Sequence, residues 1–175
     1  MGLPTQIKFG TDGWRGVIAD DFTFENVRIA ASAIGSYILA KEDPAKGVCI
    51  GYDTRFASRD FAVAVAKVIS AMGIPVSLAN CYTPTPALSY AVLHRGAAGG
   101  VMITSSHNPA QWNGVKYKAA YGGSGSPSIM AGIATYLGEP PEVAATAAPI
   151  IEVDFQTPYI KAISDFADLD LIAKS

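Results

Sequence analysis

The side chains best suited to chemistry lie together in one short run, Thr104-Ser105-Ser106-His107-Asn108-Pro109. The run begins at the last residue of an apolar stretch, Gly99 to Thr104, which has the pattern of a buried strand. Two hydroxyls, an imidazole and an Asn-Pro turn therefore leave a sheet together, and Lys116 and Lys118 follow a few residues later. Hydroxyl groups beside cations suit phosphate better than other common ligands. This run is the first candidate for a phosphate site.

Spacing alone leaves the role of Ser106 open. Serine and threonine after a strand usually form turns, so a structural role is one interpretation. The neighbouring His107 suggests the nucleophile and base of an esterase, a second interpretation. However, adjacent residues of an extended chain point to opposite sides, and the Gly-x-Ser-x-Gly elbow of hydrolases lacks its glycines here. An esterase is therefore the weaker alternative.

Two other predicted loops, Asp53-Thr54-Arg55 and Asn80 to Thr85, also follow predicted strands. Ligands of open α/β sheets bind at the carboxyl ends of the strands, so these loops are expected at the same edge as Ser106. Arg55 is interpreted either as a ligand contact or as a surface charge, and Asp53 as a cap for the next helix. Near the N-terminus, Arg15 stands between glycines and is either an anion contact or part of a turn.

The elements that must position these loops alternate between strand and helix patterns. Strands are expected at 48–52, 74–79, 99–104 and 115–118, the last reached through an Asn113-Gly114 turn. Helices are expected after caps at Thr23, at Ser58 and within Thr83-Pro84-Thr85-Pro86, where a threonine stands directly before a proline. A weak helix is expected before Leu137 and another from Thr157, with residues 138–149 as a connector. This alternation predicts an α/β fold with a mostly parallel sheet and helices on both faces.

Composition excludes several classes of protein. The 175 residues are 50% hydrophobic and 16% charged, which predicts one ordinary folded core. A net charge of −2 leaves no basic field for nucleic acid. The sequence contains no apolar stretch of 18 residues, so no membrane span is predicted. The first ten residues lack a secretory leader, so the cytoplasm is the expected location. Cys49 and Cys81 are expected to be core thiols, and two histidines without an acidic cluster do not complete a metal site.

The 104–109 run resembles the active-site serine loop of the α-D-phosphohexomutase superfamily, which includes phosphoglucomutase, phosphomannomutase and phosphoglucosamine mutase. Further stretches appear in that family's order at 9–16, 51–55, 83–86 and 113–117. The resemblance covers about residues 7–137, and the joint occurrence is more specific than any single motif. One mild departure is Ser105, where the family usually carries alanine or a similar small residue.

The resemblance implies the first domain of a four-domain enzyme. Its fold would be a three-layer α/β/α sandwich with a four-stranded mixed sheet. Residues 1–150 would form this domain, and residues 151–175 the connector and the truncated start of the second. The other three domains would supply an aspartate loop for Mg²⁺, a sugar-recognition loop and a phosphate-binding loop. The isolated chain is therefore expected to be inactive.

The resemblance also implies a role for each site residue. Ser106 would carry a phosphoryl group that is exchanged with a hexose phosphate through a bisphosphorylated sugar, and its phosphate would be this chain's one Mg²⁺ ligand. Arg15 and Lys116 would neutralise the phosphate, and Lys116 is the candidate for proton transfer. The remaining assignments are a phosphate contact or loop-shaping role for His107 and binding roles for Ser105 and Asn108.

The exact substrate stays open between glucose, mannose and glucosamine phosphates. Trp14 slightly favours the phosphogluco/phosphomannomutase type, because the glucosamine type more often has isoleucine there. A sugar-phosphate binding domain without catalysis is the other alternative.

Overall fold

The computed structural model describes residues 7–10, 12–167 and 169–174, and it contains one six-stranded sheet with the order β1-β5-β4-β2-β3-β6. The strands are β1 (Trp14–Val17), β2 (Val48–Tyr52), β3 (Val76–Ala79), β4 (Gly99–Ile103), β5 (Trp112–Ala119) and β6 (Ile150–Val153). The helices are α1 (Phe24–Lys41), the 3-10 helix η1 (Pro44–Lys46), α2 (Ser58–Ala71), α3 (Thr85–Arg95), α4 (Pro127–Ala134), α5 (Gln156–Phe166) and α6 (Leu169–Ala173).

The sheet is mixed. Strands β4, β2, β3 and β6 run parallel, whereas β5 is antiparallel to both β4 and β1. The predicted α/β class is confirmed, but the expected number of four strands is wrong. The two additional strands, β1 and β6, are four residues long and form the two edges of the sheet.

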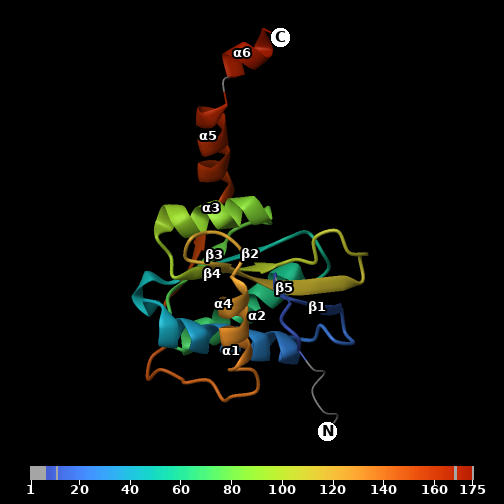
Figure 1. The fold of residues 1–175 in the computed structure, drawn as a ribbon, viewed down its shortest axis with the longest axis vertical. Coiled ribbons are helices and arrows are strands. Elements are labelled where there is room, and N and C mark those ends of the chain that lie inside the picture. The colour runs from blue at the N-terminus through green and yellow to red at the C-terminus, as the bar shows by residue number, and fades with distance from the viewer. Residues whose placement is uncertain (1–6, 11, 168, 175) are drawn as a thin grey trace.

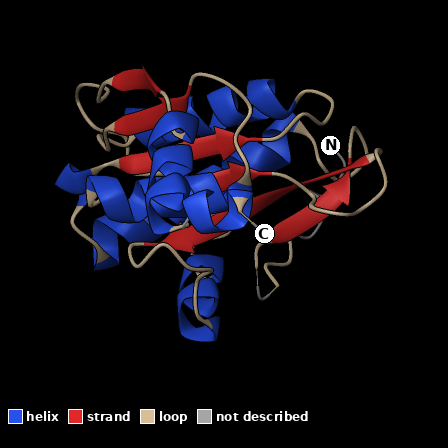
Figure 2. Cartoon of the chain, turned by 90° about the horizontal axis from the view of Figure 1, so that it is seen from above, coloured by secondary structure: helices blue, strands red, loops and turns tan. Residues whose placement is uncertain are grey.

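Helices cover both faces of the sheet, as predicted. Helices α1, α2 and α4 lie together on one face and α3 lies on the other, which gives three layers (Figure 1). Seen from above, helices lie in front of the middle of the sheet (Figure 2). The covered strands are correspondingly apolar, because all five residues of β2 and of β4 are buried. A strand that is buried on both faces reads as a continuous apolar run rather than an alternation.

The aromatic cluster of the core holds β1 to the helices beneath it. Trp14 stacks on Phe22 with 5.0 Å between ring centroids, and Phe22 meets Phe61 of α2 edge-on at 4.8 Å. Phe22 is fully buried, and Trp14 is 6% exposed. This packing fixes the strand that carries Arg15.

The predicted caps are only partly correct. Thr23 caps α1, because its hydroxyl accepts a hydrogen bond from the backbone N–H of Asn26 at 3.2 Å. Ser58 does not cap α2: it is the first residue of that helix, and its hydroxyl donates to Asp53. Likewise α3 begins at Thr85, and the Thr83 hydroxyl donates to the carbonyl oxygen of Cys81.

The predicted turn at Asn113-Gly114 is wrong. Both residues lie inside β5 and pair with β1. The Asn113 side chain explains the difference, because it is fully buried and donates to Ser58 instead of shaping a turn.

The C-terminal part continues the sheet. Residues 138–149 contain neither helix nor strand, as predicted, and β6 then pairs in parallel with β3. The sheet thus runs past residue 150, where the predicted first domain ends; this domain division stays a prediction. Helix α5 begins at Gln156, one residue before the expected Thr157, and extends away from the sheet beyond α3 (Figure 1). None of the described helices is long and apolar enough to cross a membrane.

Candidate active site

The connection from β4 to β5 together with the first residue of β5, residues 104–112, is called the serine loop. It leaves the carboxyl end of β4, the strand end at which α/β folds bind ligands. Along the loop, Ser105 is fully buried, whereas Ser106 and His107 are exposed and Asn108 is half-buried. The Ser105 hydroxyl donates to the Asn108 side-chain oxygen at 3.2 Å, and the Asn108 N–H donates to the Ser105 carbonyl at 3.1 Å. Ser105 and Asn108 therefore shape the turn from which Ser106 emerges.

Ser106 has a left-handed backbone conformation with φ of +58°. This conformation costs about 1–2 kcal/mol for a residue other than glycine, and such residues concentrate at functional sites. The backbone N–H of Ser106 donates to the Thr104 hydroxyl at 2.9 Å. The chain thus places an exposed hydroxyl on a strained, hydrogen-bonded turn.

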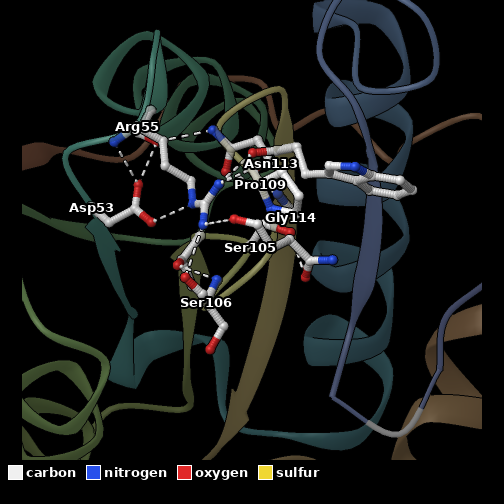
Figure 3. A network of polar contacts seen from close by, with 11 residues as sticks. Asp53, Arg55, Ser105, Ser106, Pro109, Asn113 and Gly114 are labelled. Carbon is white, nitrogen blue, oxygen red and sulfur yellow. Dashed lines mark hydrogen bonds and ion pairs between the residues drawn. The ribbon is translucent and has the colours of Figure 1, made fainter.

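The Arg55 side chain points toward the serine loop and binds its backbone (Figure 3). Its Nη1 donates to the carbonyl oxygens of Pro109 at 2.9 Å and Trp112 at 3.0 Å. Its Nη2 donates to those of Ser106 at 2.8 Å and Asn108 at 2.7 Å. The interpretation of Arg55 as a surface charge is therefore wrong, since its side chain is only 14% exposed and is engaged by the loop.

Asp53 fixes Arg55 from the other side. Its Oδ2 lies 3.3 Å from the Arg55 Nε, and its Oδ1 accepts from the Arg55 backbone N–H at 3.0 Å and the Ser58 hydroxyl at 2.8 Å. The Ser58 hydroxyl in turn accepts from the Asn113 side-chain nitrogen at 2.9 Å. These contacts, drawn in Figure 3, join the end of β2 and the start of α2 to β5.

Two lysines of β5 converge on Asp12. The Lys116 ammonium donates to Asp12 Oδ2 at 2.6 Å, and the Lys118 ammonium lies 3.6 Å from Oδ1. Both lysines are less than 10% exposed. The Ser124 hydroxyl donates to Asp12 Oδ1 at 2.7 Å and accepts from Lys118 at 2.9 Å. Burial by itself would raise the pKa of Asp12, but the hydrogen bonds from Lys116 and Ser124 and the two lysine charges outweigh it, so the pKa is lowered.

Arg15 belongs to the same face of the sheet as the lysines. It pairs with Gly114 across the β1–β5 ladder, and alternate residues of a strand share a face, so Lys116 and Lys118 follow Gly114 on that face. Arg15 is exposed, and with Lys8, Gly10, Asp12 and Gly13 it lines an open cavity of about 250 Å³. A cationic hollow therefore lies beside β5. Thr11, within the 9–16 stretch, lies outside the described residues.

The sheet register relates this hollow to the serine loop. Lys116 pairs with Met102, four residues before Ser106, and the Thr104 N–H donates to the Gly114 carbonyl at 3.0 Å. Arg15 and Lys116 thus lie on the neighbouring strands β1 and β5, and Ser106 lies on the loop that follows the next strand, β4. The roles predicted for these residues, and for His107, Ser105 and Asn108, stay predictions.

Two contributors to the site were missed by the sequence analysis. Asp12 received no role, and its ion pair with Lys116 joins residues 104 apart. Arg55 was left between two interpretations, although its place after a strand end was a usable signal.

The described residues do not form a magnesium site by themselves. Among them, no three His, Cys, Asp or Glu residues lie together as metal ligands. Asp12 is paired with lysines and Asp53 with Arg55, so both carboxylates are already neutralised by side-chain cations and neither is directed to a metal ion. Magnesium is usually held through carboxylates together with phosphate oxygens.

Comparison with known proteins decides the family. A family model described as phosphoglucomutase/phosphomannomutase, alpha/beta/alpha domain I, matches residues 6–142. The chain belongs to this family, as its N-terminal domain. The resemblance read from the motifs is confirmed.

Several members of the phosphohexomutase family are similar to this chain. A phosphoglucomutase of Staphylococcus haemolyticus is 35% identical over 82% of the chain and 27% of its own length. A phosphoglucosamine mutase of Alkaliphilus oremlandii is 39% identical over 62% of the chain and 24% of its length. A solved structure described as a putative phosphomannomutase of Thermus thermophilus is 40% identical, with a TM-score of 0.84, over 97% of the chain and 38% of its own. The chain thus spans about a quarter to two fifths of these relatives.

Proposed function

We propose that this chain is the phosphoserine-bearing domain of a phosphohexomutase that interconverts hexose 1-phosphate and hexose 6-phosphate. The observation that carries the proposal is the exposed Ser106 in a left-handed conformation at the tip of a loop whose backbone is bound by Arg55. A serine at a position that favours glycine suggests selection for its hydroxyl. Family membership supplies the reaction class, and the proposal extends to the remaining domains of the longer relatives as partners.

The proposed reaction is an exchange of one phosphoryl group in two steps. In the first, a free hydroxyl of the hexose phosphate attacks phosphorus, the bond from phosphorus to Ser106 Oγ breaks, and Oγ takes up the proton that the sugar hydroxyl loses. The sugar bisphosphate then turns over, and its other phosphoryl group returns to Ser106 by the reverse exchange of bonds and proton. Overall, one phosphate has moved between the two ends of the sugar.

Charge neutralisation is the contribution proposed for Arg15 and Lys116. Phosphoryl transfer spreads negative charge over the equatorial oxygens, and fixed cations in a partly dry site stabilise that charge. Lys116 is only 7% exposed, and Arg15 borders the cavity beside it. The proton-transfer role of Lys116, the phosphate contact of His107 and the cytoplasmic location belong to the same proposal.

Magnesium enters the proposal only through Ser106. When bound, it would neutralise the phosphoryl oxygens, with the phosphate on Ser106 as one ligand. The carboxylate ligands would come from segments beyond this chain, because the two acids nearest the site, Asp12 and Asp53, are engaged by cations.

A joined enzyme tests the reaction: this chain followed by the segments that the Thermus relative carries beyond the matched region. We expect conversion of glucose 1-phosphate or mannose 1-phosphate to the 6-phosphate, and loss of at least about 1,000-fold in kcat for Ser106→Ala. Ser128→Ala, an exposed serine of α4, is the matched control and should retain activity. Preference for glucosamine 1-phosphate would move the chain to the phosphoglucosamine mutases, as the Alkaliphilus relative suggests.

Peptide mapping of the joined enzyme after exposure to glucose 1,6-bisphosphate tests the residue. The added phosphate is expected on Ser106, and a phosphate on Ser105 or Thr104 would contradict the assignment.

Arg15→Ala and Lys116→Ala should lower kcat more than they raise KM, whereas Arg59→Ala on α2 should change neither. The 175-residue chain alone should show no turnover above its Ser106→Ala variant, because positioning dominates this chemistry.

A further inference from the structure

We propose that Arg55 is the positioning residue of the serine loop, and that it holds Ser106 ready for transfer without binding the phosphate itself. The inference rests on the proposed function for its meaning. Its evidence is the hydrogen bonding of one side chain, which is independent of any activity.

Every N–H of the Arg55 guanidinium already has an acceptor. An arginine side chain offers five N–H groups and accepts none. Four of them go to the serine-loop carbonyls at 2.7–3.0 Å, and Nε faces Asp53 Oδ2 at 3.3 Å. No N–H is left over for a phosphate oxygen. Arg55 therefore differs from Arg15, which is exposed beside an open cavity.

The four carbonyls are distributed along the serine loop from Ser106 to Trp112. Ser106 and Asn108 share Nη2, while Pro109 and Trp112 share Nη1. One planar cation thus fixes the direction of four peptide groups between Ser106 and Trp112. Hydrogen bonds from a charged donor are stronger than neutral ones, which favours a backbone conformation that serine would otherwise avoid.

Arg55 is itself held in place by a network of hydrogen bonds around Asp53. Asp53 accepts hydrogen bonds from the Arg55 backbone and from Ser58, and Ser58 accepts from the buried Asn113 side chain. This network therefore joins the end of β2, the first turn of α2 and β5. A shift of the loop against the sheet would break several of these contacts together.

Lysine cannot replace arginine here. Its three N–H groups radiate from one nitrogen and cannot reach four carbonyls arranged around a plane. Arg55→Lys therefore keeps the positive charge and removes the geometry. Arg59→Lys is the matched control, because Arg59 lies four residues further on, is exposed, and pairs with Glu152 at 3.0 Å.

The test is hydrogen exchange of the 175-residue chain, followed peptide by peptide. The N–H groups of Asn108 and Trp112 donate within the serine loop and report its order. In Arg55→Lys we expect the loop peptide to exchange at least tenfold faster, with β2 and β4 unchanged, and in Arg59→Lys no change. An unchanged loop would overturn the proposal. An equal rise in all peptides would also overturn it, because Arg55 would then support the whole fold.

Chemical rescue separates positioning from a general loss of packing. Arg55→Ala should show the same loop exchange, and guanidinium ion at tens of millimolar should restore protection to the loop, whereas ammonium ion should not. Loss of protection that guanidinium leaves unchanged would contradict the proposed contact.

Kinetics of the joined enzyme distinguish a positioning residue from a phosphate ligand. Arg55→Lys should lower kcat at least 100-fold while KM for glucose 1-phosphate stays within threefold. A raised KM with normal kcat would make Arg55 a substrate contact and overturn the inference. If the joined enzyme has no mutase activity, the proposed function fails, while hydrogen exchange still decides whether Arg55 orders the loop.

Discussion

Replacement of Gly13 by alanine tests how tightly the N-terminal segment is pressed against β5. Gly13 has φ of +124°, and a Cβ there would lie 2.1 Å from the Val115 carbonyl oxygen and 2.8 Å from the Lys116 Cα. Both atoms belong to the backbone of a strand that is paired on its two sides. The alanine can therefore be accommodated only if β1 and β5 move apart.

The loss of folding free energy expected for Gly13→Ala is the sum of two terms. A side chain in this backbone region costs roughly 1–3 kcal/mol, and forced overpacking costs roughly another 1–3 kcal/mol. Gly96→Ala is the control, because Gly96 also has a positive φ, +61°, but its Cβ would meet nothing within 4 Å. Gly96→Ala should cost only the backbone term, about 1–2 kcal/mol. The difference between the two variants therefore measures the overlap together with the additional strain of the +124° backbone at Gly13.

Urea unfolding of the 175-residue chain gives this difference. With a slope of about 2 kcal/mol per molar, Gly13→Ala should unfold about 1 M earlier than Gly96→Ala. Following both fluorescence and circular dichroism detects local release of β1, because Trp14 is buried against Phe22. Midpoints that agree for the two variants, with coincident probes, would refute the close approach of Gly13 to β5.

Three further predictions concern metal, pH and thiols. Calorimetry of the 175-residue chain should show no saturable magnesium binding, and no difference from Ser106→Ala; tight binding lost in that variant would mean that the chain holds a fuller site. The pKa of Asp12 is lowered, so its contribution to stability is present above about pH 4 and is lost as the pH falls through the folded-state pKa. Below about pH 4, the melting temperature of Asp12→Asn should therefore depend less on pH than that of wild type. Asp20→Asn, at an exposed residue, is the control. Burial raises the pKa of the Cys49 thiol to about 11, so at about pH 8 a thiol reagent should label the more exposed Cys81 first, and equal rates would contradict the burial of Cys49.

The central elements were predictable because their sequences are distinctive. Strands β2 and β4 are continuous apolar runs bounded by polar loops, and α1 carries its cap and apolar spacing together. The two edge strands were missed for a physical reason. β1 alternates over four residues only, and the first three residues of β6, Ile150 to Glu152, are exposed, so neither has a pattern that differs from a loop. Their strand conformation depends on pairing with β5 and β3.

The same distinction applies to the site. The serine loop was found because its side chains carry the chemistry and stand together in sequence. The place of Arg55 after a strand end was a usable signal, but its contacts were not predictable. Its four acceptors are backbone carbonyls 51 to 57 residues away, and every residue has such a carbonyl. The ion pair of Asp12 with Lys116 likewise depends on how distant segments meet across the β1–β5 ladder.

The pairing of β1 with β5 has a consequence for synthesis of the protein on the ribosome. In the sheet β1 has β5 as its neighbour, and the contact from Asp12 to Lys116 spans 104 residues. At roughly 5–20 residues per second, about 5–20 s pass between synthesis of these two residues. During that interval Arg15 has no strand to pair with, while the parallel strands β2, β3 and β4 are already being made. The N-terminal part of the candidate active site therefore joins the sheet late, although it is made first.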